Sequence, residues 1–227
     1  MQAFAEHAPE ELIGPLNEVE RQHAPARLFT AGNIELLRGG LRVSVVGSRD
    51  ATTQGLGRAR ALVETLVRRG VVVVSGLAEG IDTQAHWAAI NAGGKTITVL
   101  GTPLDVCFPR QNQALLHRIT QSHLAVSQFA VGSPPQKKNF PMRNRTMALL
   151  SDATIIVEAG EGSGTIHQGW EALRLGRPLF LLESLTKRTD LTWPAEMQQY
   201  GAEVLTKERL TVVLDELPGR PRGELAF

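Results

Sequence analysis

The 227-residue sequence is poor in cysteine and in aromatic residues. Its one cysteine, Cys107, cannot form an internal disulfide, and its neighbours Val106 and Phe108 are typical of a small core residue rather than a nucleophile. Aromatic residues make up 5% of the chain. Any aromatic contact with a ligand would therefore fall to very few side chains, of which Phe108 and Phe140 are the candidates.

The sequence also lacks the patterns of membrane, secreted and metal-binding proteins. No apolar run approaches the roughly 20 residues that a membrane span needs, and the acidic N-terminal residues do not form a secretory signal. No His/Cys/Asp cluster has the spacing of metal ligands, and no Ser-His-Asp arrangement is readable. We therefore expect a cytoplasmic protein with no membrane partner, no metal, no cofactor and no catalytic residues.

Acidic residues are missing from one long stretch. No Asp or Glu lies between Asp105 and Asp152, although the chain as a whole has 24 Lys and Arg against 23 Asp and Glu. A local basic field on a nearly neutral protein is expected where a phosphate-bearing ligand binds, and a solvated basic face is the alternative. The cations of this stretch are Arg110, Arg118, Lys137, Lys138, Arg143 and Arg145.

Short β-branched runs alternate with helical patterns from about residue 41 onward. The runs cover residues 43–46, 71–74, 96–100, 124–127, 153–157 and 178–182. Helices are expected from residue 56 to a stop at Gly70, from an N-cap at Asp82 or Thr83 to residue 92, and at 111–121, 143–150 and 165–175. Nearly continuous apolar strands are typical of parallel sheets covered on both sides. The fold class is therefore α/β, a doubly wound, mostly parallel Rossmann-like sheet with helices on both faces.

We expect three regions along the chain. Residues 1–40 form a small helical or irregular lead-in, residues 41–217 the Rossmann-like domain, and residues 218–227 a loose tail. In such a sheet, ligands bind at the carboxyl ends of the strands, near helix N-termini. Glycine and small hydroxyl residues there let the backbone approach a phosphate. The candidates at these turns are Gly47, Ser48, Arg49, Ser75, Gly76, Ser163, Gly164 and Thr165.

The same turns resemble the motifs of the DNA-processing protein A (DprA/Smf) family. The matching segments are Gly47-Ser48-Arg49 with Thr52 and Gly55, Ser75-Gly76-Leu77-Ala78 with Gly80-Ile81-Asp82, Leu100-Gly101 with Phe108-Pro109, Phe140-Pro141 with Arg143-Asn144-Arg145, and Val157-Glu158-Ala159 with Ser163-Gly164. Together they run through most of the chain in the family's order. The sequence departs from the family at Glu79, where Arg is frequent, and at Gln168, where Thr is common.

The resemblance implies a single-stranded-DNA-binding protein with an extended Rossmann fold. Members bind DNA without cleaving it, usually as homodimers, and help to load the RecA recombinase during natural transformation. From the sequence we expect no C-terminal winged-helix module, which many relatives carry. Carried over by motif, Arg49, Arg143 and Arg145 would hold the DNA backbone, with Asn144 in the same motif. Lys137 and Lys138 are candidates from the charge pattern alone.

Two other functions remain open at this point. The chain also resembles the LOG phosphoribohydrolases, which hydrolyse nucleoside monophosphates and carry a Glu where this sequence has Gln168. An amide cannot take a proton or stabilise an oxocarbenium-like charge as a carboxylate does, which disfavours hydrolysis. The third reading is a module that binds a nucleotide ligand and signals to a partner.

Overall fold

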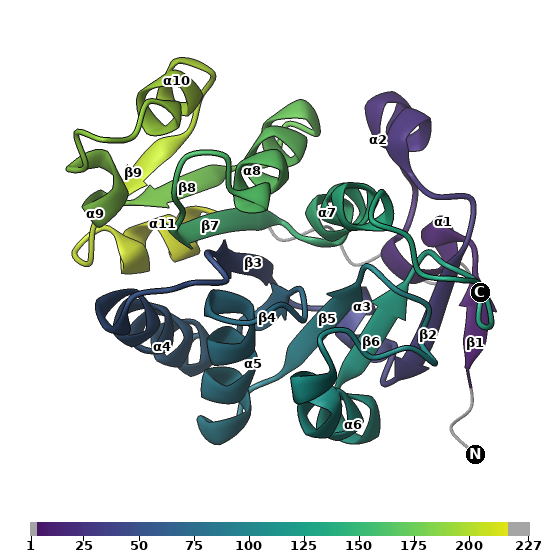
Figure 1. Cartoon of the computed structure of the whole chain (residues 1–227). Helices are drawn as coiled ribbons and strands as arrows, with labels where there is room; N and C mark the ends of the chain where they lie inside the picture. The colour runs from purple at the N-terminus through teal and green to yellow at the C-terminus, as the bar shows by residue number, and fades with distance from the viewer. Residues whose placement is uncertain (1–3, 218–227) are drawn as a thin grey trace.

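The computed structural model describes residues 4–217, which form one nine-stranded sheet in the order β1-β2-β6-β5-β4-β3-β7-β8-β9 (Figure 1). The strands from β6 to β9 in that order are parallel, and β1 and β2 add antiparallel to the β6 edge. The strands are β1 (Ala5–His7), β2 (Leu28–Gly32), β3 (Arg42–Gly47), β4 (Val72–Ser75), β5 (Thr96–Leu100), β6 (Leu124–Ser127), β7 (Ala153–Glu158), β8 (Leu179–Leu182) and β9 (Glu203–Leu205).

Helices cover both faces of this sheet. Successive residues of β3 point to opposite sides: Val45 packs in one apolar cluster with Val63, whereas Val46 packs in another with Met147. Figure 1 shows α4, α5 and α6 on one side of the sheet and α7 and α8 on the other. The predicted doubly wound α/β class is therefore confirmed. The helices are α1 (Pro9–Ile13), α2 (Glu18–His23), α3 (Glu35–Arg38), α4 (Thr53–Arg68), α5 (Ile81–Asn91), the 3-10 turn η1 (Arg110–Asn112), α6 (Gln113–Ser122), α7 (Asn139–Leu150), α8 (Gly164–Arg174), α9 (Glu183–Thr186), α10 (Trp193–Gln199) and α11 (Leu210–Glu216).

The structure differs from the expected elements in several places. Strand β9 was not expected, and it extends the sheet beyond β8. The lead-in is more than helical or irregular, because β1 and β2 lie within residues 1–40 and β2 pairs with β6. The N-cap of α5 is Gly80, with a φ of 74°, rather than Asp82 or Thr83. Helix α7 begins at Asn139, four residues before the predicted start. The tail at 218–227 lies outside the described residues.

The order of the strands creates a switch point beside β3. From β3 the chain adds β4, β5 and β6 on one side, and then returns to place β7, β8 and β9 on the other. The connections after β3 and after β7 therefore leave the sheet in opposite directions, which opens a crevice at the carboxyl ends of these two strands. Among residues 4–217, no helix is long and apolar enough to span a membrane.

Candidate nucleic-acid interface

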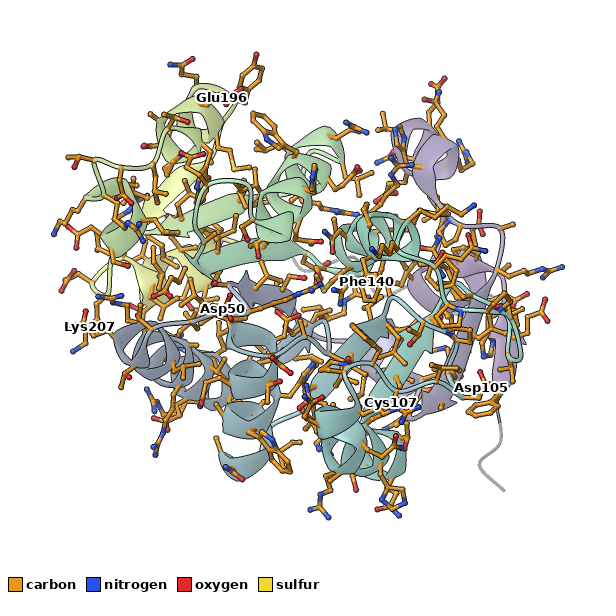
Figure 2. The ribbon with its side chains drawn as sticks, viewed as in Figure 1. Asp50, Asp105, Cys107, Phe140, Glu196 and Lys207 are labelled. Atoms are coloured by element: carbon orange, nitrogen blue, oxygen red, sulfur yellow. The ribbon has the colours of Figure 1, made fainter. Side chains whose placement is uncertain are left out.

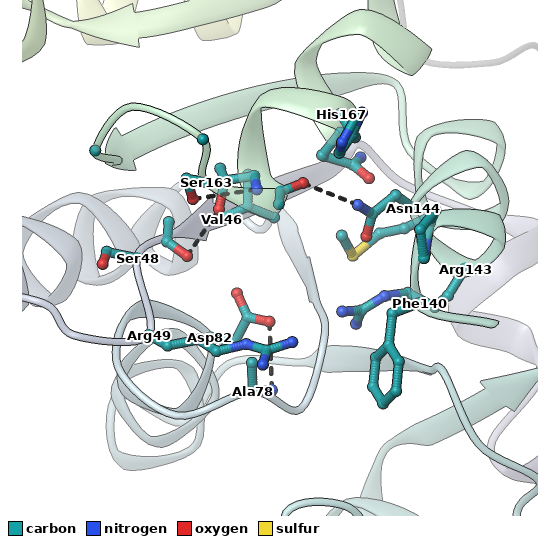
Figure 3. Close-up of a pocket in the computed structure, with 18 of the residues that line it drawn as sticks. Val46, Ser48, Arg49, Ala78, Asp82, Phe140, Arg143, Asn144, Ser163 and His167 are labelled. Carbon is teal, nitrogen blue, oxygen red and sulfur yellow. Dashed lines mark hydrogen bonds between the residues drawn. The ribbon is translucent and has the colours of Figure 1, made fainter. Parts of the chain in front are cut away.

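A cavity of about 480 Å³ occupies the carboxyl ends of β3 and β7 (Figure 3). Its walls come from the turn after β3, from the first turns of α7, and from the glycine-rich turn that leads into α8. In the side-chain view, Phe140 lies near the centre of the molecule, whereas Glu196 and Lys207 lie far from it (Figure 2). The cavity thus sits where the switch point places it, with three segments distant in sequence around it.

The turn after β3 is held by hydrogen bonds to its neighbours. The Ser48 N–H donates to the Glu158 carbonyl oxygen at 2.6 Å, and the Ser48 carbonyl accepts from the Ile81 N–H at 3.1 Å. A Cβ at Gly80 would lie 2.2 Å from the Ser48 carbonyl oxygen, and the φ of Gly80 is positive. Only glycine therefore allows the start of α5 to pack on this turn. The backbone that carries Arg49 is fixed as a result.

Arg49 is exposed at the mouth of the cavity, next to two aromatic rings. Its guanidinium carbon lies 5.8 Å from the centre of the Phe140 ring, within the range of a cation–π contact. The Phe140 and Phe108 rings meet edge to face with centroids 5.5 Å apart, and Phe108 is 51% exposed. A smaller hollow of about 140 Å³, lined by Arg49 and both rings, adjoins the main cavity. The site therefore joins a flexible cation to an accessible aromatic surface.

Arg143, on α7, also lines this cavity. Its side chain is buried, and its Nη1 donates to the Val99 carbonyl oxygen at 2.8 Å. A Cβ at Gly76 would lie 1.8 Å from this Nη1, so Gly76 makes room for the guanidinium. Figure 3 shows the guanidinium groups of Arg49 and Arg143 directed toward the same space. Two cations thus face one cavity, one exposed and one buried.

The buried carboxylate of Asp82 lies beside Arg143 at the cavity floor. Burial raises the pKa of Asp82, and the nearby Arg143 opposes that rise by favouring the charged carboxylate. Burial likewise lowers the pKa of Arg143, an effect that Asp82 opposes. The floor of the cavity therefore holds one buried acid and one buried base, and Arg49 is the exposed cation at its mouth.

The N-terminus of α8 forms the opposite wall. The Ser163 hydroxyl oxygen accepts from the Thr165 N–H at 3.3 Å as the N-cap, and the Thr165 hydroxyl donates to the Gly47 carbonyl at 2.9 Å. The Asn144 amide donates to the Gly164 carbonyl at 3.1 Å, which ties α7 to α8. Backbone N–H groups in a first helical turn lack intrahelical partners and carry partial positive charge. This wall is therefore suited to an anion.

The structure brings together most of the residues predicted to bind phosphate. Arg145, however, does not line the cavity, because its guanidinium forms an ion pair with Glu171 on α8 at 3.1 Å. Lys137 and Lys138 are exposed just before α7 and also lie outside the cavity wall. The predicted residues that do line it are Gly47, Ser48, Arg49, Arg143, Asn144, Ser163, Gly164 and Thr165.

Two predicted phosphate-binding residues do not face the cavity. Ser75 cannot serve as a phosphate donor, because it is fully buried and its hydroxyl donates to the Val45 carbonyl at 2.7 Å. Gly76 is a buried spacer for Arg143 rather than a ligand-facing turn. Arg143, expected to hold the DNA backbone, is only 6% exposed and is bonded to a backbone carbonyl, so it is also part of the structure of the site.

Acidic residues in the cavity wall were missed by the sequence reasoning. Asp50 follows Arg49, and Glu161 lies in the glycine-rich turn before α8; both are exposed and line the cavity with the buried Asp82. Their positions beside predicted ligand residues are the signal that could have found them. The acid-free stretch therefore does not produce a purely basic cavity, since acids from outside that stretch contribute to its wall.

The fold and this geometry define a Rossmann-like protein with a cavity at its switch point, lined by two arginines and a helix N-terminus. The chain belongs to the DNA recombination-mediator protein A family, whose family model matches residues 7–215. The resemblance found in the motifs is thereby confirmed.

Two curated relatives bear the name DNA processing protein DprA. The protein from Streptococcus pneumoniae (strain ATCC BAA-255 / R6) is 42% identical over 168 residues, 74% of this chain and 59% of the relative. The protein from Bacillus subtilis (strain 168) is 35% identical over 196 residues, 86% of this chain and 65% of the relative. The chain thus spans about three fifths of the length of these relatives.

Solved structures agree with the assignment. The DNA processing protein A structure from Streptococcus pneumoniae superposes with a TM-score of 0.81 at 34% identity, over 96% of this chain and 76% of that one. DNA processing protein A from Helicobacter pylori, described for its single-stranded DNA binding mode, has a TM-score of 0.79 at 26% identity, over 96% of this chain and 100% of that one. A molybdenum cofactor binding protein from Rippkaea orientalis, 20% identical with a TM-score of 0.56, shares the fold alone.

Proposed function

We propose that this chain binds single-stranded DNA at the cavity between β3, α7 and α8, without cleaving it. The single observation that carries this proposal is the exposed Arg49, beside the Phe108–Phe140 pair and in one cavity with the N-terminus of α8. Single-strand binders combine backbone cations with aromatic surfaces on which bases stack. The Helicobacter pylori relative supports the same ligand class.

The strand would use the two hollows differently. A phosphate binds between the Arg49 guanidinium and the α8 N-terminus, because the cation and the helix dipole both favour an anion there. A neighbouring base lies over Phe108, which presents an accessible ring. Lys137 and Lys138, exposed just before α7, extend the positive field along the strand.

The family supports the wider role proposed for the whole protein. We infer that it is a recombination mediator that helps to load RecA on DNA taken up during natural transformation, and that it acts as a homodimer in the cytoplasm. A phosphoribohydrolase would need a carboxylate in this cavity at the position of Gln168, where an amide stands. Binding without covalent chemistry therefore fits the residues better than hydrolysis does.

A titration with a fluorescent oligothymidylate over a range of salt concentrations tests this proposal. Arg49→Glu should lower the affinity by about tenfold or more and make the salt dependence shallower, because a phosphate contact is lost and a repulsion is added. Arg68→Glu is the matched control, since Arg68 is exposed on α4, away from the cavity. Equal binding by the two variants would rule out the site, and tight binding of mononucleotides alone would favour a nucleotide sensor.

A further inference from the structure

A separate groove of about 430 Å³, the α4–α11 groove, lies away from the cavity of the proposed DNA site. One of its walls is α4, and the others are the segments that follow β8 and β9 together with the start of α11. Helices α4 and α11 lie on the same side of the sheet (Figure 1). Among residues 4–217, no wall residue of this groove also lines either hollow of the DNA site. A ligand in the groove and a strand in the cavity can therefore be bound together.

The floor of the α4–α11 groove is aliphatic. Leu62, Leu205 and Leu210 belong to the apolar cluster beneath α4 and α11, and the half-buried Leu182 packs against that cluster. Of the described residues that line the groove, none is aromatic. Proteins that bind single strands use aromatic rings on which the bases stack. This floor therefore suits the apolar side chains of a peptide better than nucleobases.

Three cations, Arg58, Arg68 and Lys207, line the same groove, and Lys207 lies at the edge of the molecule (Figure 2). Within residues 4–217 none of the three forms an ion pair. The Arg58 Nη2 donates to the Gln54 amide oxygen at 3.2 Å, and the Arg68 Nη2 donates to the Thr65 hydroxyl at 2.7 Å. Both acceptors are neutral, so they leave the charge of these arginines uncompensated.

The acidic residues of the groove wall do not compensate these cations. Glu64 is in an ion pair with Arg60 at 2.8 Å, and Glu183 is in an ion pair with Lys187 at 2.9 Å. Neither Arg60 nor Lys187 lines the groove, and Glu208, which follows Lys207, does not line it either. The groove therefore presents a net positive charge above an apolar floor, which is complementary to a ligand with both carboxylates and apolar groups.

The spacing of the cations indicates the length of this ligand. Arg58 and Arg68 are separated by about 15 Å along the axis of α4. An extended peptide of about five residues covers this distance, and its successive side chains point to opposite faces. Alternate apolar side chains can therefore lie on the leucine floor while the acidic side chains between them reach the cations.

We propose that the α4–α11 groove binds an extended acidic segment of a partner protein. Its apolar side chains pack on the leucine floor, and its carboxylates pair with Arg58, Arg68 and Lys207 through charge-assisted hydrogen bonds. This site does not depend on the proposed DNA binding, because the two sites have separate walls. The protein can thus hold a partner on one surface while a strand occupies the other.

Fluorescence anisotropy with a labelled peptide of sequence Asp-Leu-Asp-Leu-Asp tests the proposal. Two further peptides carry Asn in place of each Asp, or Ser in place of each Leu. The unmodified protein should bind the first peptide about tenfold more tightly than either of the others, because the groove uses both charge and apolar contact. Arg68→Glu should weaken binding of the first peptide by about tenfold or more, since it replaces an attraction by a repulsion. Arg118→Glu, on the exposed face of α6, is the matched control and should leave it unchanged.

A competition with oligothymidylate separates this site from the DNA site. A saturating concentration of oligothymidylate should not displace the acidic peptide, and displacement would make the groove part of the path of the strand instead. Equal binding of the peptides with Leu and with Ser would reduce the groove to a basic surface without an apolar floor. Equal effects of Arg68→Glu and Arg118→Glu, or no binding of the acidic peptide at millimolar concentration, would overturn the proposal.

Discussion

At the scale of single residues, Arg49 and Arg143 have different tasks although both guanidinium groups face one cavity. Arg49 is exposed, and a neighbouring ring is its contact, so it can follow a ligand. Arg143 is buried and fixed by the Val99 carbonyl, with Asp82 nearby. The first arginine is suited to binding and the second to forming the floor on which binding takes place.

Charge reversal should lower the free energy of unfolding much more at the buried Arg143 than at the exposed Arg145 of the same motif. Arg143→Glu should lower the free energy of unfolding by about 3–5 kcal/mol, because it places a carboxylate beside Asp82 and removes the hydrogen bond to Val99. Arg145→Glu, its control two residues away, should cost about 1 kcal/mol or less, since the Arg145 side chain is 39% exposed in its ion pair. Urea unfolding measures both, and equal losses would contradict the assignment.

Sequence could predict the turns but not the direction of every side chain in them. The Gly47-Ser48-Arg49 turn follows a β-branched strand, and strand ends meet at one edge, so its place in the site was readable. Ser75 is the last residue of β4 and points into the sheet, and Arg145 points to Glu171, twenty-six residues further along. Such partners depend on how helices pack, which local patterns do not encode.

At the scale of elements, the buried pair of Arg42 and Asp152 fixes the two strands that border the cavity. The Arg42 Nη2 lies 3.1 Å from Asp152 Oδ1, and both side chains are almost completely buried. The Arg42 backbone N–H also donates to Asp152 Oδ2 at 2.8 Å. The pair joins the beginning of β3 to the residue before β7, so it sets where the carboxyl ends of these strands meet.

Removing one member of this pair should be strongly destabilising. Arg42→Met leaves the Asp152 carboxylate buried without its guanidinium and should lower the free energy of unfolding by about 3–5 kcal/mol. Arg60→Met on the exposed face of α4 should change it by less than about 1 kcal/mol. Chemical denaturation compares the two variants, and a loss at Arg42 no larger than at Arg60 would show that the pair does not hold the strands.

The long β-branched runs predicted β3 to β8, whereas the strands at both edges, β1 and β2 on one side and β9 on the other, escaped detection. β1 reads Ala-Glu-His and β2 reads Leu-Phe-Thr-Ala-Gly, so neither carries a β-branched run. Their pairing with β6 depends on contacts distant in sequence. Helix α7 begins at Asn139, before the expected start at Arg143, and Pro141 is accommodated within its first turn.

At the scale of the whole molecule, a buried histidine links stability to pH. His86 contacts the Thr96 hydroxyl at 2.7 Å and the carbonyl of Gly76, and burial lowers its pKa to about 4 from 6.5. As the pH falls, His86 therefore binds a proton near pH 6.5 in the unfolded chain but only near pH 4 in the folded protein. Between these values the unfolded state binds more protons, and stability falls as the pH falls.

Between pH 6.5 and pH 4, the titration of His86 should lower the free energy of unfolding by on the order of 3 kcal/mol. The raised pKa of Asp82 acts in the opposite direction, because a buried carboxylate is relieved by protonation. Urea unfolding at several pH values should give a shallower slope in this interval for His86→Gln than for the unmodified protein. A slope unchanged by the substitution would mean that His86 is not the group responsible.

Amide hydrogen exchange with and without a short oligothymidylate tests the central claim most directly, that one edge of the sheet receives the strand. The account predicts slower exchange in residues 47–50, 139–145 and 160–168, with little change in α10 and β9. Protection confined to α10 and β9, or no protection at a saturating concentration of oligonucleotide, would contradict it.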